Sequence, residues 1–511
     1  MVIKKIVEQV KKHCSIFIYL AVSICIAWLS RIVVSRLFDI ADSYILFDTC
    51  FAISLIVATV IYFRKQLYNT LHIIVFSAIM IAGCCYINIS PVVPILGYDE
   101  TTHYKAIVNL IGNATGKINL ADEMIVSYYD QHDADLFSQE GRAQIEDSAN
   151  SLWNETEKPY HGETLNFQNV KNYVSYSPYI IGRIIRKAIG LNFTETYRFS
   201  KALNLLLYAS LISLSVKLTK SYKTIFTCIG TLPLILFEAS SYQYDPLLIG
   251  SLMLSYAIFL HCNEVGKIRN KNIATIAFFA TVGLMVKPVY FPILIPMLMA
   301  DDKLFKNKKQ QHIFKTVAIV CICIAIGYIF LPALCGGLGT GDLRGGTDVN
   351  ATEQVKFILH NPVHYGIIMG KYMISEYLNP IIAFGYIGAI GSIGMMTTSI
   401  ILFLLLIGST LFNGNECTFG KKYKFVCWVS WFLSVILVIT SLYVSFTGVA
   451  SETVSGVQPR YHLPILCLIF STIKGKFGNC NKSGEIYATL FAMIMSLSFV
   501  LYTGMYFVYM Y

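Results

Sequence analysis

The sequence predicts an all-α polytopic integral membrane protein with about 13 transmembrane helices, on the basis of three observations. Hydrophobic residues make up 55% of the 511 residues and charged residues only 14%, with a mean hydropathy of +0.58. Long apolar runs recur along the chain, and lysine and arginine gather between alternate runs. Such a composition lies outside the range of soluble globular proteins, so the composition alone predicts the class.

The apolar runs give the expected positions of the helices. A hydrocarbon core about 30 Å thick requires roughly 20 mainly apolar residues in each spanning helix. The runs that meet this requirement are 14–32, 44–63, 71–90, 198–216, 224–242, 246–262, 273–289, 313–335, 393–412, 424–446 and 485–508. Two shorter runs, 290–300 and 461–473, are also counted as expected spans.

The distribution of charge predicts the orientation. Short loops rich in lysine and arginine stay on the cytoplasmic side, and the chain begins with such a segment, which contains Lys4, Lys5, Lys11 and Lys12. We therefore expect a cytoplasmic N-terminus and a retained first span. Residues 98–175 carry thirteen acids against five bases, which predicts that this loop lies outside. Because the basic residues are dispersed over separate short loops, the net charge of +10 does not indicate nucleic-acid binding.

These features predict one membrane core with additions at both ends. Residues 1–70 form two additional N-terminal helices, 71–475 the core, and 476–511 a C-terminal helix. Two large external loops interrupt the core, at 91–197 and 336–390. In the first, 101–112 suits a helix along the bilayer surface and 176–191 an interfacial or re-entrant helix, with an irregular or loosely helical cap at 128–165 between them. The second begins with CGGLGTGDLRGGTDVN, which lacks the strand-to-helix setting of a phosphate-binding loop and predicts a flexible segment.

Unusual polar groups are expected at the outer membrane face. They are Asp99, Glu100 and His103 after the third span, Asp245 in SSYQYDPLL, Lys287 in MVKPVYFP, and Arg460 with Tyr461 and His462 in QPRYHLP. Ionisable groups near bilayer depth are costly and persist mainly where they face a polar cavity or one another. Each also has a structural interpretation: Asp99 as a helix cap, Asp245 as a helix start, Lys287 extending to the interface, and the histidines as hydrogen-bonded core groups.

The chemistry of these residue types suggests two roles. A guanidinium such as that of Arg460 suits phosphate or carboxylate recognition. The adjacent carboxylates Asp99 and Glu100 would suit a hard divalent cation if a metal binds, although two carboxylates are too few to define a metal site. No zinc-type spacing occurs in the sequence.

The order of four motifs resembles a known family. The motifs are Asp-Glu-x-x-His from Asp99 to His103, Tyr-Asp-Pro-Leu at 244–247, Lys-Pro-x-Tyr at 287–290 and Gln-Pro-Arg-Tyr-x-x-Pro at 458–464. Together they resemble a bacterial family of predicted membrane proteins known only as domain of unknown function 2142, over roughly residues 75–475. That family is in turn similar to the C-type glycosyltransferase superfamily, which takes sugars from polyprenyl-phosphate carriers at the outer face.

The resemblance implies a C-type core in the bacterial plasma membrane that moves a sugar from a polyprenyl-phosphate-linked donor to a cell-surface glycan or lipid-linked acceptor. It implies Asp99 as the first candidate for a general base and Glu100 as the second, with His103 beside them. Arg460, with Lys287, His462, Asp245 and Tyr461, would bind the lipid phosphate. The alternatives are a flippase or transporter of lipid-linked oligosaccharide, a polymerase of glycan repeats, and a non-enzymatic envelope protein.

Overall fold

A computed structural model describes residues 2–38, 43–95, 99–131, 133–153, 157–160, 167–334, 341–377, 404–408, 410, 419–473 and 482–510. The described elements are almost entirely helical. The long helices are α1 (Val2–Phe38), α2 (Tyr44–Tyr62), α3 (Leu67–Ile89), α9 (Phe193–Leu218), α12 (Asp245–Val265), α13 (Asn270–Val286), α14 (Lys308–Leu334), α19 (Lys421–Ser445) and α21 (Lys482–Met510).

The shorter elements lie between them. They are η1 (Arg64–Gln66), α4 (Glu100–Thr115), β1 (Lys117–Ile118), α5 (Leu120–Asp130), η2 (Ala134–Phe137), α6 (Gln139–Leu152), β2 (Lys158–Pro159), α7 (Phe167–Ser175), α8 (Ser177–Ile189), α10 (Lys223–Gly230), α11 (Pro233–Ala239), η3 (Pro288–Leu294), η4 (Pro296–Met299), η5 (Asp302–Leu304), η6 (Leu343–Gly345), α15 (Ala351–His360), α16 (Pro362–Tyr372), η7 (Met373–Tyr377), η8 (Pro459–Ile465) and α20 (Leu466–Ile473). The two strands pair antiparallel, with Lys117 opposite Pro159.

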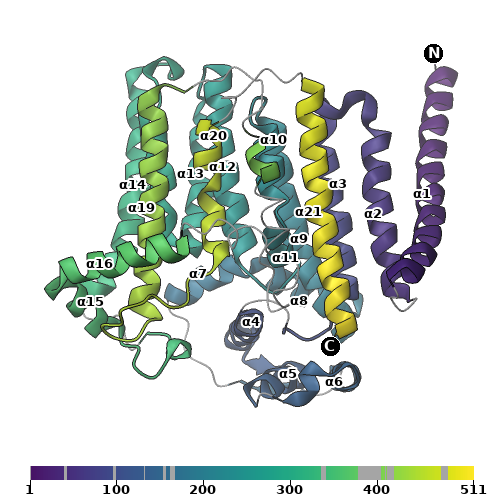
Figure 1. The fold of residues 1–511 in the computed structure, drawn as a ribbon, viewed down its shortest axis with the longest axis horizontal. Coiled ribbons are helices and arrows are strands. Elements are labelled where there is room, and N and C mark those ends of the chain that lie inside the picture. The colour runs from purple at the N-terminus through teal and green to yellow at the C-terminus, as the bar shows by residue number, and fades with distance from the viewer. Residues whose placement is uncertain are drawn as a thin grey trace.

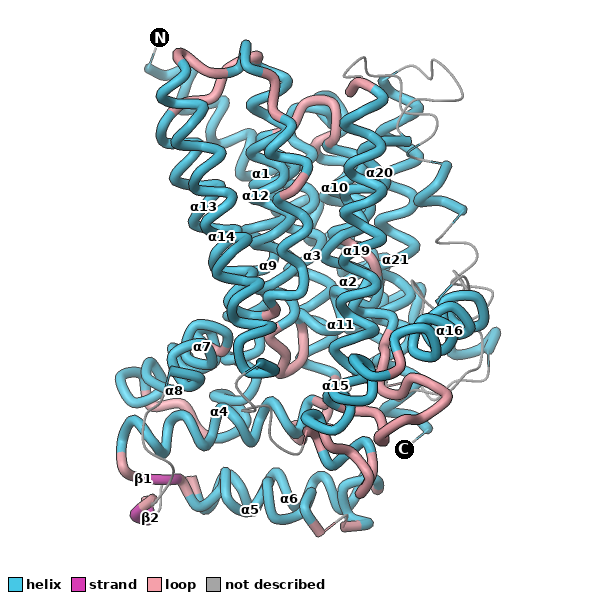
Figure 2. The backbone as a smooth tube through the Cα atoms, turned by 90° about the vertical axis from the view of Figure 1, so that its left-hand side faces the viewer, coloured by secondary structure: helices cyan, strands magenta, loops and turns pink. Residues whose placement is uncertain are grey.

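The long helices form a bundle, and the short helices of both excursions gather at one end of it (Figure 1). We call this end, which carries α4 to α8, α15 and α16, the excursion end. Figure 2 shows α4, α5 and α6 beneath the bundle and α15 and α16 beside its lower part. Since α9 begins beside α8 and its 26 residues rise about 39 Å, Lys217 and Lys220 lie at the opposite end. The chain thus separates its lysine-rich turns from its acidic excursion, as the charge pattern predicts.

The prediction of a polytopic helical membrane protein is confirmed. Within the described residues, eight helices are long and apolar enough to cross a membrane. They correspond to the expected runs 14–32, 44–63, 71–90, 198–216, 246–262, 313–335, 424–446 and 485–508. Three further runs form shorter apolar helices, Asn270–Val286, Pro288–Met299 and Arg460–Ile473. The span expected at 393–412 lies largely outside the described residues.

The expectation of a single span at 224–242 is wrong. The chain forms two short helices there, α10 and α11, which are separated at Thr231 and Leu232. Pro233 has no backbone N–H to donate and disfavours a helical conformation in the residue before it. Leu232 is accordingly extended, with φ −58° and ψ 139°. Every residue of both helices is buried, so the interruption lies inside the bundle.

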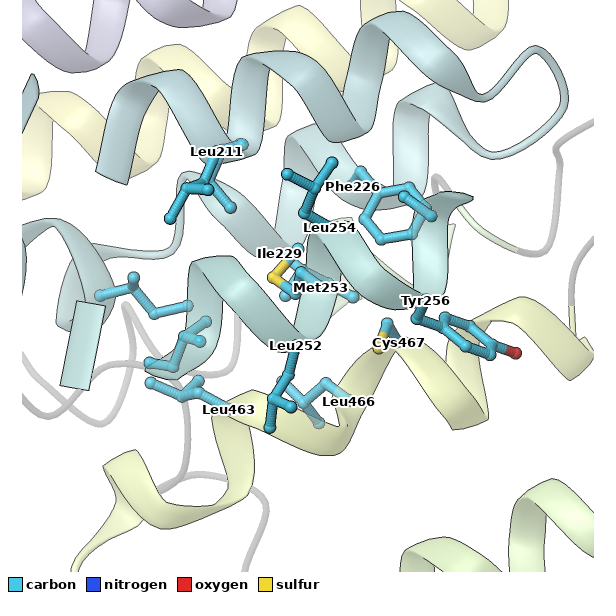
Figure 3. Packing of buried hydrophobic residues seen from close by; sticks show 14 of the residues in the cluster. Leu211, Phe226, Ile229, Leu252, Met253, Leu254, Tyr256, Leu463, Leu466 and Cys467 are labelled. Carbon is cyan, nitrogen blue, oxygen red and sulfur yellow. The ribbon is translucent and has the colours of Figure 1, made fainter. Parts of the chain in front are cut away.

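Apolar side chains from several helices fill the core. Leu211 of α9, Phe226 and Ile229 of α10, and Leu252 of α12 pack together with Leu466 of α20, as Figure 3 shows. Burial of apolar surface contributes about 25 cal/mol for each Å² removed from water. Helix association within lipid depends more on close packing. The core therefore fixes the positions of α11, α12 and η8, which carry the polar groups described below.

The first excursion has its own apolar cluster. Region 128–165 was predicted to be an irregular or loosely helical cap, and the short helices η2 and α6 form within it. A buried ion pair joins α5 to α8: Arg183 donates to both oxygens of Asp122, at 3.0 and 2.8 Å. The Tyr104 hydroxyl of α4 also donates to Asp122. This pairing holds α4 against its neighbours and thereby fixes the helix that carries Asp99 at its start.

The described part of the glycine-rich run is packed, in contrast to the predicted flexible segment. The backbone N–H of Asp342 donates to the carbonyl of Ser445 at 2.7 Å, and that of Val449 donates to the carbonyl of Asp348 at 3.1 Å. A Cβ placed on Gly345 would lie 1.9 Å from the Phe446 carbonyl oxygen. Glycine at this position is therefore required for the close approach of the loop to the end of α19.

Replacement of Gly345 with alanine should detach this loop. We expect faster proteolysis near residue 345 in detergent, because the added methyl group and the Phe446 carbonyl cannot occupy the same space. Gly366→Ala in α16 is the matched control, since a Cβ there meets open space. Equal cleavage rates for the two variants would contradict the close packing of Gly345.

Candidate functional site

Four elements converge at the inner surface of the excursion end. The turn between α11 and α12 carries Gln243 and Tyr244, and α12 begins at Asp245. α13 ends at Val286 and is followed by Lys287, since Pro288 prevents the helix from continuing. η8 supplies Arg460, and α4 is preceded by Asp99. Because α12 and α11 both pack against η8, residues far apart in the sequence meet here.

Arg460 lies at the centre of this group and its side chain is only 3% exposed. Its Nη2 donates to Asp99 Oδ2 at 2.8 Å, and its Nη1 lies 3.3 Å from Glu238 Oε1. Nη1 also lies 3.3 Å from the side-chain oxygen of Gln243, and Nε lies 3.5 Å from Asp245 Oδ2. One guanidinium therefore contacts three carboxylates, and we call Asp99, Glu238, Asp245, Lys287 and Arg460 the ion cluster.

Lys287 completes the cluster by pairing with Asp245. Its Nζ lies 2.8 Å from Asp245 Oδ1 and also faces the rings of Tyr461 and Tyr244, at 4.4 and 5.1 Å from their centroids. A cation over the face of an aromatic ring is stabilised by the ring quadrupole. Lys287 thus joins the carboxylate cluster to an aromatic wall, and the structural interpretation of Asp245 as a helix start holds at the same time.

Asp99 adopts an unusual backbone conformation. Its φ of 58° and ψ of 10° lie in the left-handed region, which is uncommon for residues other than glycine. The expectation that its side chain caps α4 is wrong, because it makes no capping hydrogen bond. Instead, Oδ1 lies 2.6 Å from Nη1 of Arg344, and Oδ2 accepts from Arg460. The conformation turns the carboxylate away from the helix and toward the two guanidinium groups.

The side chain of Glu100 points toward Lys201 of α9. Its side chain is fully buried, and its Oε1 lies 2.9 Å from Lys201 Nζ of α9 while accepting from the backbone N–H of Tyr242 at 3.0 Å. Asp99 and Glu100 therefore face different cations and do not converge on a common point. Within the described residues, no group of three or more His, Cys, Asp or Glu side chains could hold a metal ion. The pair Asp99 and Glu100 thus does not fit the divalent cation considered from the sequence.

The two histidines lie in different surroundings. His103 is buried on α4, with Nδ1 2.6 Å from the Tyr176 hydroxyl and its ring edge-on to Tyr244 at 4.6 Å. Burial holds the pKa of His103 well below its usual value, and the positive charge of Arg460 lowers it further. His462 is half-buried on η8, two residues after Arg460. His462 is not a member of the ion cluster, whereas Arg460 lies at its centre and Tyr461 contributes its ring to the aromatic wall.

A neutral, buried His103 predicts a dependence of stability on pH. The unfolded chain protonates this histidine below about pH 6.5 whereas the folded protein does not, so stability should fall as the pH falls below that value. The loss should approach about 1.4 kcal/mol per pH unit for this one group. Thermal unfolding of His103→Gln between pH 7 and 5 should show a smaller pH dependence than the wild type. His364→Gln, which alters an exposed histidine, should keep the wild-type dependence.

A cavity of about 630 Å³ opens beside the ion cluster. Lys287, Tyr244 and Tyr461 form its polar end, and its walls come from α14, α15 and α19, including Ile329, Ile358 and Leu437. A smaller cavity of about 130 Å³ shares Lys171, Pro288 and Tyr328 with it and extends along α13 and α14. The volume lies within the usual range of ligand sites, and the apolar walls with a few polar groups are typical of such sites.

The sequence did not indicate the charged partners of Arg460, Asp99 and Glu100, which are Glu238, Arg344 and Lys201 respectively. Glu238 and Lys201 stand in apolar runs that were counted as spans, and an isolated charge within such a run was the available signal. Arg344 stands in the glycine-rich run, where an exposed charged residue is ordinary. Its pairing with Asp99 depends on the packing of that run against α19, which no local pattern indicates.

Comparison with known protein families shows to which family the chain belongs. The family model described as "Predicted membrane protein (DUF2142)" matches residues 80–469. The chain belongs to the DUF2142 family. The match includes every member of the ion cluster and leaves α1 and α2 of this DUF2142 protein outside it. No curated protein and no solved structure matches the chain.

Proposed function

We propose that this DUF2142 protein is a membrane glycosyltransferase with a C-type core. It moves a sugar from a polyprenyl-phosphate-linked donor to a hydroxyl of a cell-surface glycan or lipid-linked acceptor. The excursion end faces outward from the bacterial plasma membrane and the N-terminus faces the cytoplasm, in keeping with the lysine-rich opposite end. The proposal is supported by the pairing of Asp99 with buried Arg460, in an ion cluster whose Lys287 borders a cavity with apolar walls.

The exposure of Asp99 is the observation that carries this proposal. Its side chain is 28% exposed, whereas those of Glu238 and Asp245 are 0% and 3% exposed. An acceptor hydroxyl can therefore reach Asp99 but not the other two carboxylates of the cluster. Arg460 fixes one oxygen of Asp99, and such fixed orientation favours proton transfer. Glu100 is the weaker candidate for the base, because it is fully buried against Lys201.

The reaction would proceed as a displacement at the anomeric carbon. The acceptor hydroxyl gives its proton to Asp99 while its oxygen bonds to the anomeric carbon. The bond from that carbon to the phosphate oxygen breaks, and its electron pair stays on the lipid phosphate. Cationic groups near the leaving phosphate stabilise the charge that develops there. Lys287, at the polar end of the cavity, is the cluster cation that borders this space.

In this proposal, the isoprenoid chain of the donor explains why the cavity has apolar walls. An isoprenoid chain is insoluble in water, so its sugar and phosphate must be handled at the membrane surface while the chain stays among apolar side chains. The cavity walls on α14 and α19 belong to two of the candidate spans. This arrangement supports a lipid-linked donor better than a water-soluble nucleotide sugar.

The proposal is tested by analysing the surface glycans of a strain from which the gene for this protein has been deleted. Restoring the wild-type gene should restore the missing glycan, whereas Asp99→Asn should not, although the protein is inserted at wild-type levels. Asp130→Asn, which alters an exposed aspartate of the same excursion, is the matched control and should restore the glycan. Mass spectrometry of the surface glycans distinguishes these outcomes. Full restoration by Asp99→Asn would contradict the role of Asp99 as base.

A flippase of lipid-linked oligosaccharide is the second candidate, because α10 and α11 form an interrupted helix that ends near buried Glu238. Interrupted helices with buried charges are typical of transporters. The ion cluster nevertheless lies at one end of the bundle, which favours surface chemistry. A polymerase of glycan repeats would use the same chemistry as a transferase, with a longer acceptor.

A further inference from the structure

The first excursion contributes a lysine to the wall of the cavity. Lys171, on α7, borders both the large and the small cavity. Its Nζ lies 5.5 Å from the centroid of the Tyr328 ring of α14. Among the described residues, no carboxylate forms an ion pair with it. No motif in the sequence drew attention to this residue, and nothing assigns it a role.

The cations in and beside the ion cluster have carboxylate partners, whereas Lys171 has none among the described residues. Arg460 already contacts three carboxylates, and Arg344 contacts Asp342 and Asp99. Lys287 is paired with Asp245. An incoming anion at Arg460 would have to compete with the Asp99, Glu238 and Asp245 carboxylates for the same donors. At Lys171 no described carboxylate would compete with the incoming anion.

Lys171 and Lys287 border one cavity from different helices. Burial lowers the pKa of Lys171, and the positive charge of Lys287 lowers it further. Two ammonium groups at one cavity repel each other unless an anion lies between them. A bound phosphate would relieve this repulsion and accept hydrogen bonds from both groups, while apolar walls that include Val286 and Ile358 receive an attached chain.

We propose that Lys171 and Lys287 together bind a phosphate group in this cavity, and that this phosphate is the head group of an isoprenoid lipid. The assignment rests on the proposed transferase function for its choice of lipid. In this proposal the principal phosphate ligand is Lys171, and not Arg460 as the family resemblance implies. Arg460 then acts as a positioning residue that holds Asp99.

The test is the thermal stability of the purified full-length protein with three probes: farnesyl phosphate, farnesol and inorganic phosphate. A ligand that binds the folded state raises the unfolding temperature. We expect farnesyl phosphate to stabilise the wild type more than farnesol does. Lys171→Gln should weaken the apparent affinity for farnesyl phosphate about tenfold, as expected for loss of a charge-assisted hydrogen bond. Its response to farnesol should be unchanged, and Lys171→Arg should restore most of the affinity.

The matched control is Lys356→Gln on α15. This lysine stands beside the cavity-lining Val355, but its side chain is 58% exposed and pairs with Glu353. It removes the same charge from the same region and should bind farnesyl phosphate as the wild type does. Equal weakening by both variants would overturn the proposal, since a general charge effect would then explain the result.

The remaining outcomes are also decisive. Lys171-dependent stabilisation by inorganic phosphate alone, with no gain from the farnesyl chain, would support the phosphate site and assign it to a free phosphate. Absence of stabilisation by either phosphate would overturn the site. Because no acceptor is present, binding is measured apart from transfer. The proposed transferase function can therefore fail while the phosphate site holds.

Discussion

Arg460→Gln should destabilise the protein by about 3–5 kcal/mol, the usual cost of breaking a buried charge pair. Arg460 contacts Asp99, Glu238 and Asp245, and its removal leaves Glu238 buried without its counter-charge. Glutamine supplies hydrogen-bond donors but no charge. Lysine should not restore stability fully, because a single ammonium cannot donate in several directions from the position of a planar guanidinium. Thermal or denaturant unfolding in detergent measures the effect.

The matched control for this prediction is Arg344→Gln. Arg344 contacts the same Asp99 from the other side, but its side chain is 48% exposed. Exposed ion pairs contribute about 0–1 kcal/mol, so this variant should remain close to the wild type. A similar loss for both variants would show that Asp99 pairing, and not the buried three-carboxylate arrangement, determines stability.

Glu100→Gln should also cost about 3–5 kcal/mol, because it leaves Lys201 buried without its partner. The pair joins α4 of the first excursion to α9 of the bundle, and Lys201 Nζ also faces the Tyr197 ring at 4.5 Å. Loss of the pair should loosen the excursion as well as lower the unfolding temperature. Unfolding and limited proteolysis of the excursion together measure this effect.

A double-mutant cycle tests whether Glu100 and Lys201 stabilise the protein through a direct interaction or independently of each other. Glu100→Gln with Lys201→Met removes both charges and should be more stable than either single variant. The exposed pair Lys105 and Asp130 is the control cycle, in which each change should be nearly neutral. Additive losses at Glu100 and Lys201 would contradict their direct interaction.

The sequence was sufficient to predict the membrane class and most helices, because apolar runs and charged turns are local signals. It misplaced the region 224–242, where the apolar run continues through a proline that divides the helix. Asp99, Asp245, Lys287 and Arg460 were expected at one membrane face because each follows or precedes an apolar run, and the structure brings the four side chains together in the ion cluster. Their partners were not foreseen, because Glu238 lies within an apolar run and Arg344 lies 245 residues from Asp99.

The side-chain direction of Asp99 and Glu100 could not be predicted either. Adjacent residues at a helix start normally diverge by about 100°, and only tertiary packing decides which of them enters the core. Here the left-handed conformation of Asp99 turns it toward Arg460, while Glu100 enters the core beside Lys201. The same packing brings Lys171 to the cavity, although its surroundings in the sequence are polar.

The most direct test of the proposed transfer is an assay in proteoliposomes that contain a polyprenyl-phosphate-linked sugar labelled in the sugar. Acceptor glycan is added at the outside, and the assay measures both the labelled acceptor and the free polyprenyl phosphate. We expect the wild type to form both products in equal amounts and Asp99→Asn to form neither, whereas Asp130→Asn should behave as the wild type. Movement of intact donor across the bilayer, with no new glycosidic bond, would contradict the proposed transfer.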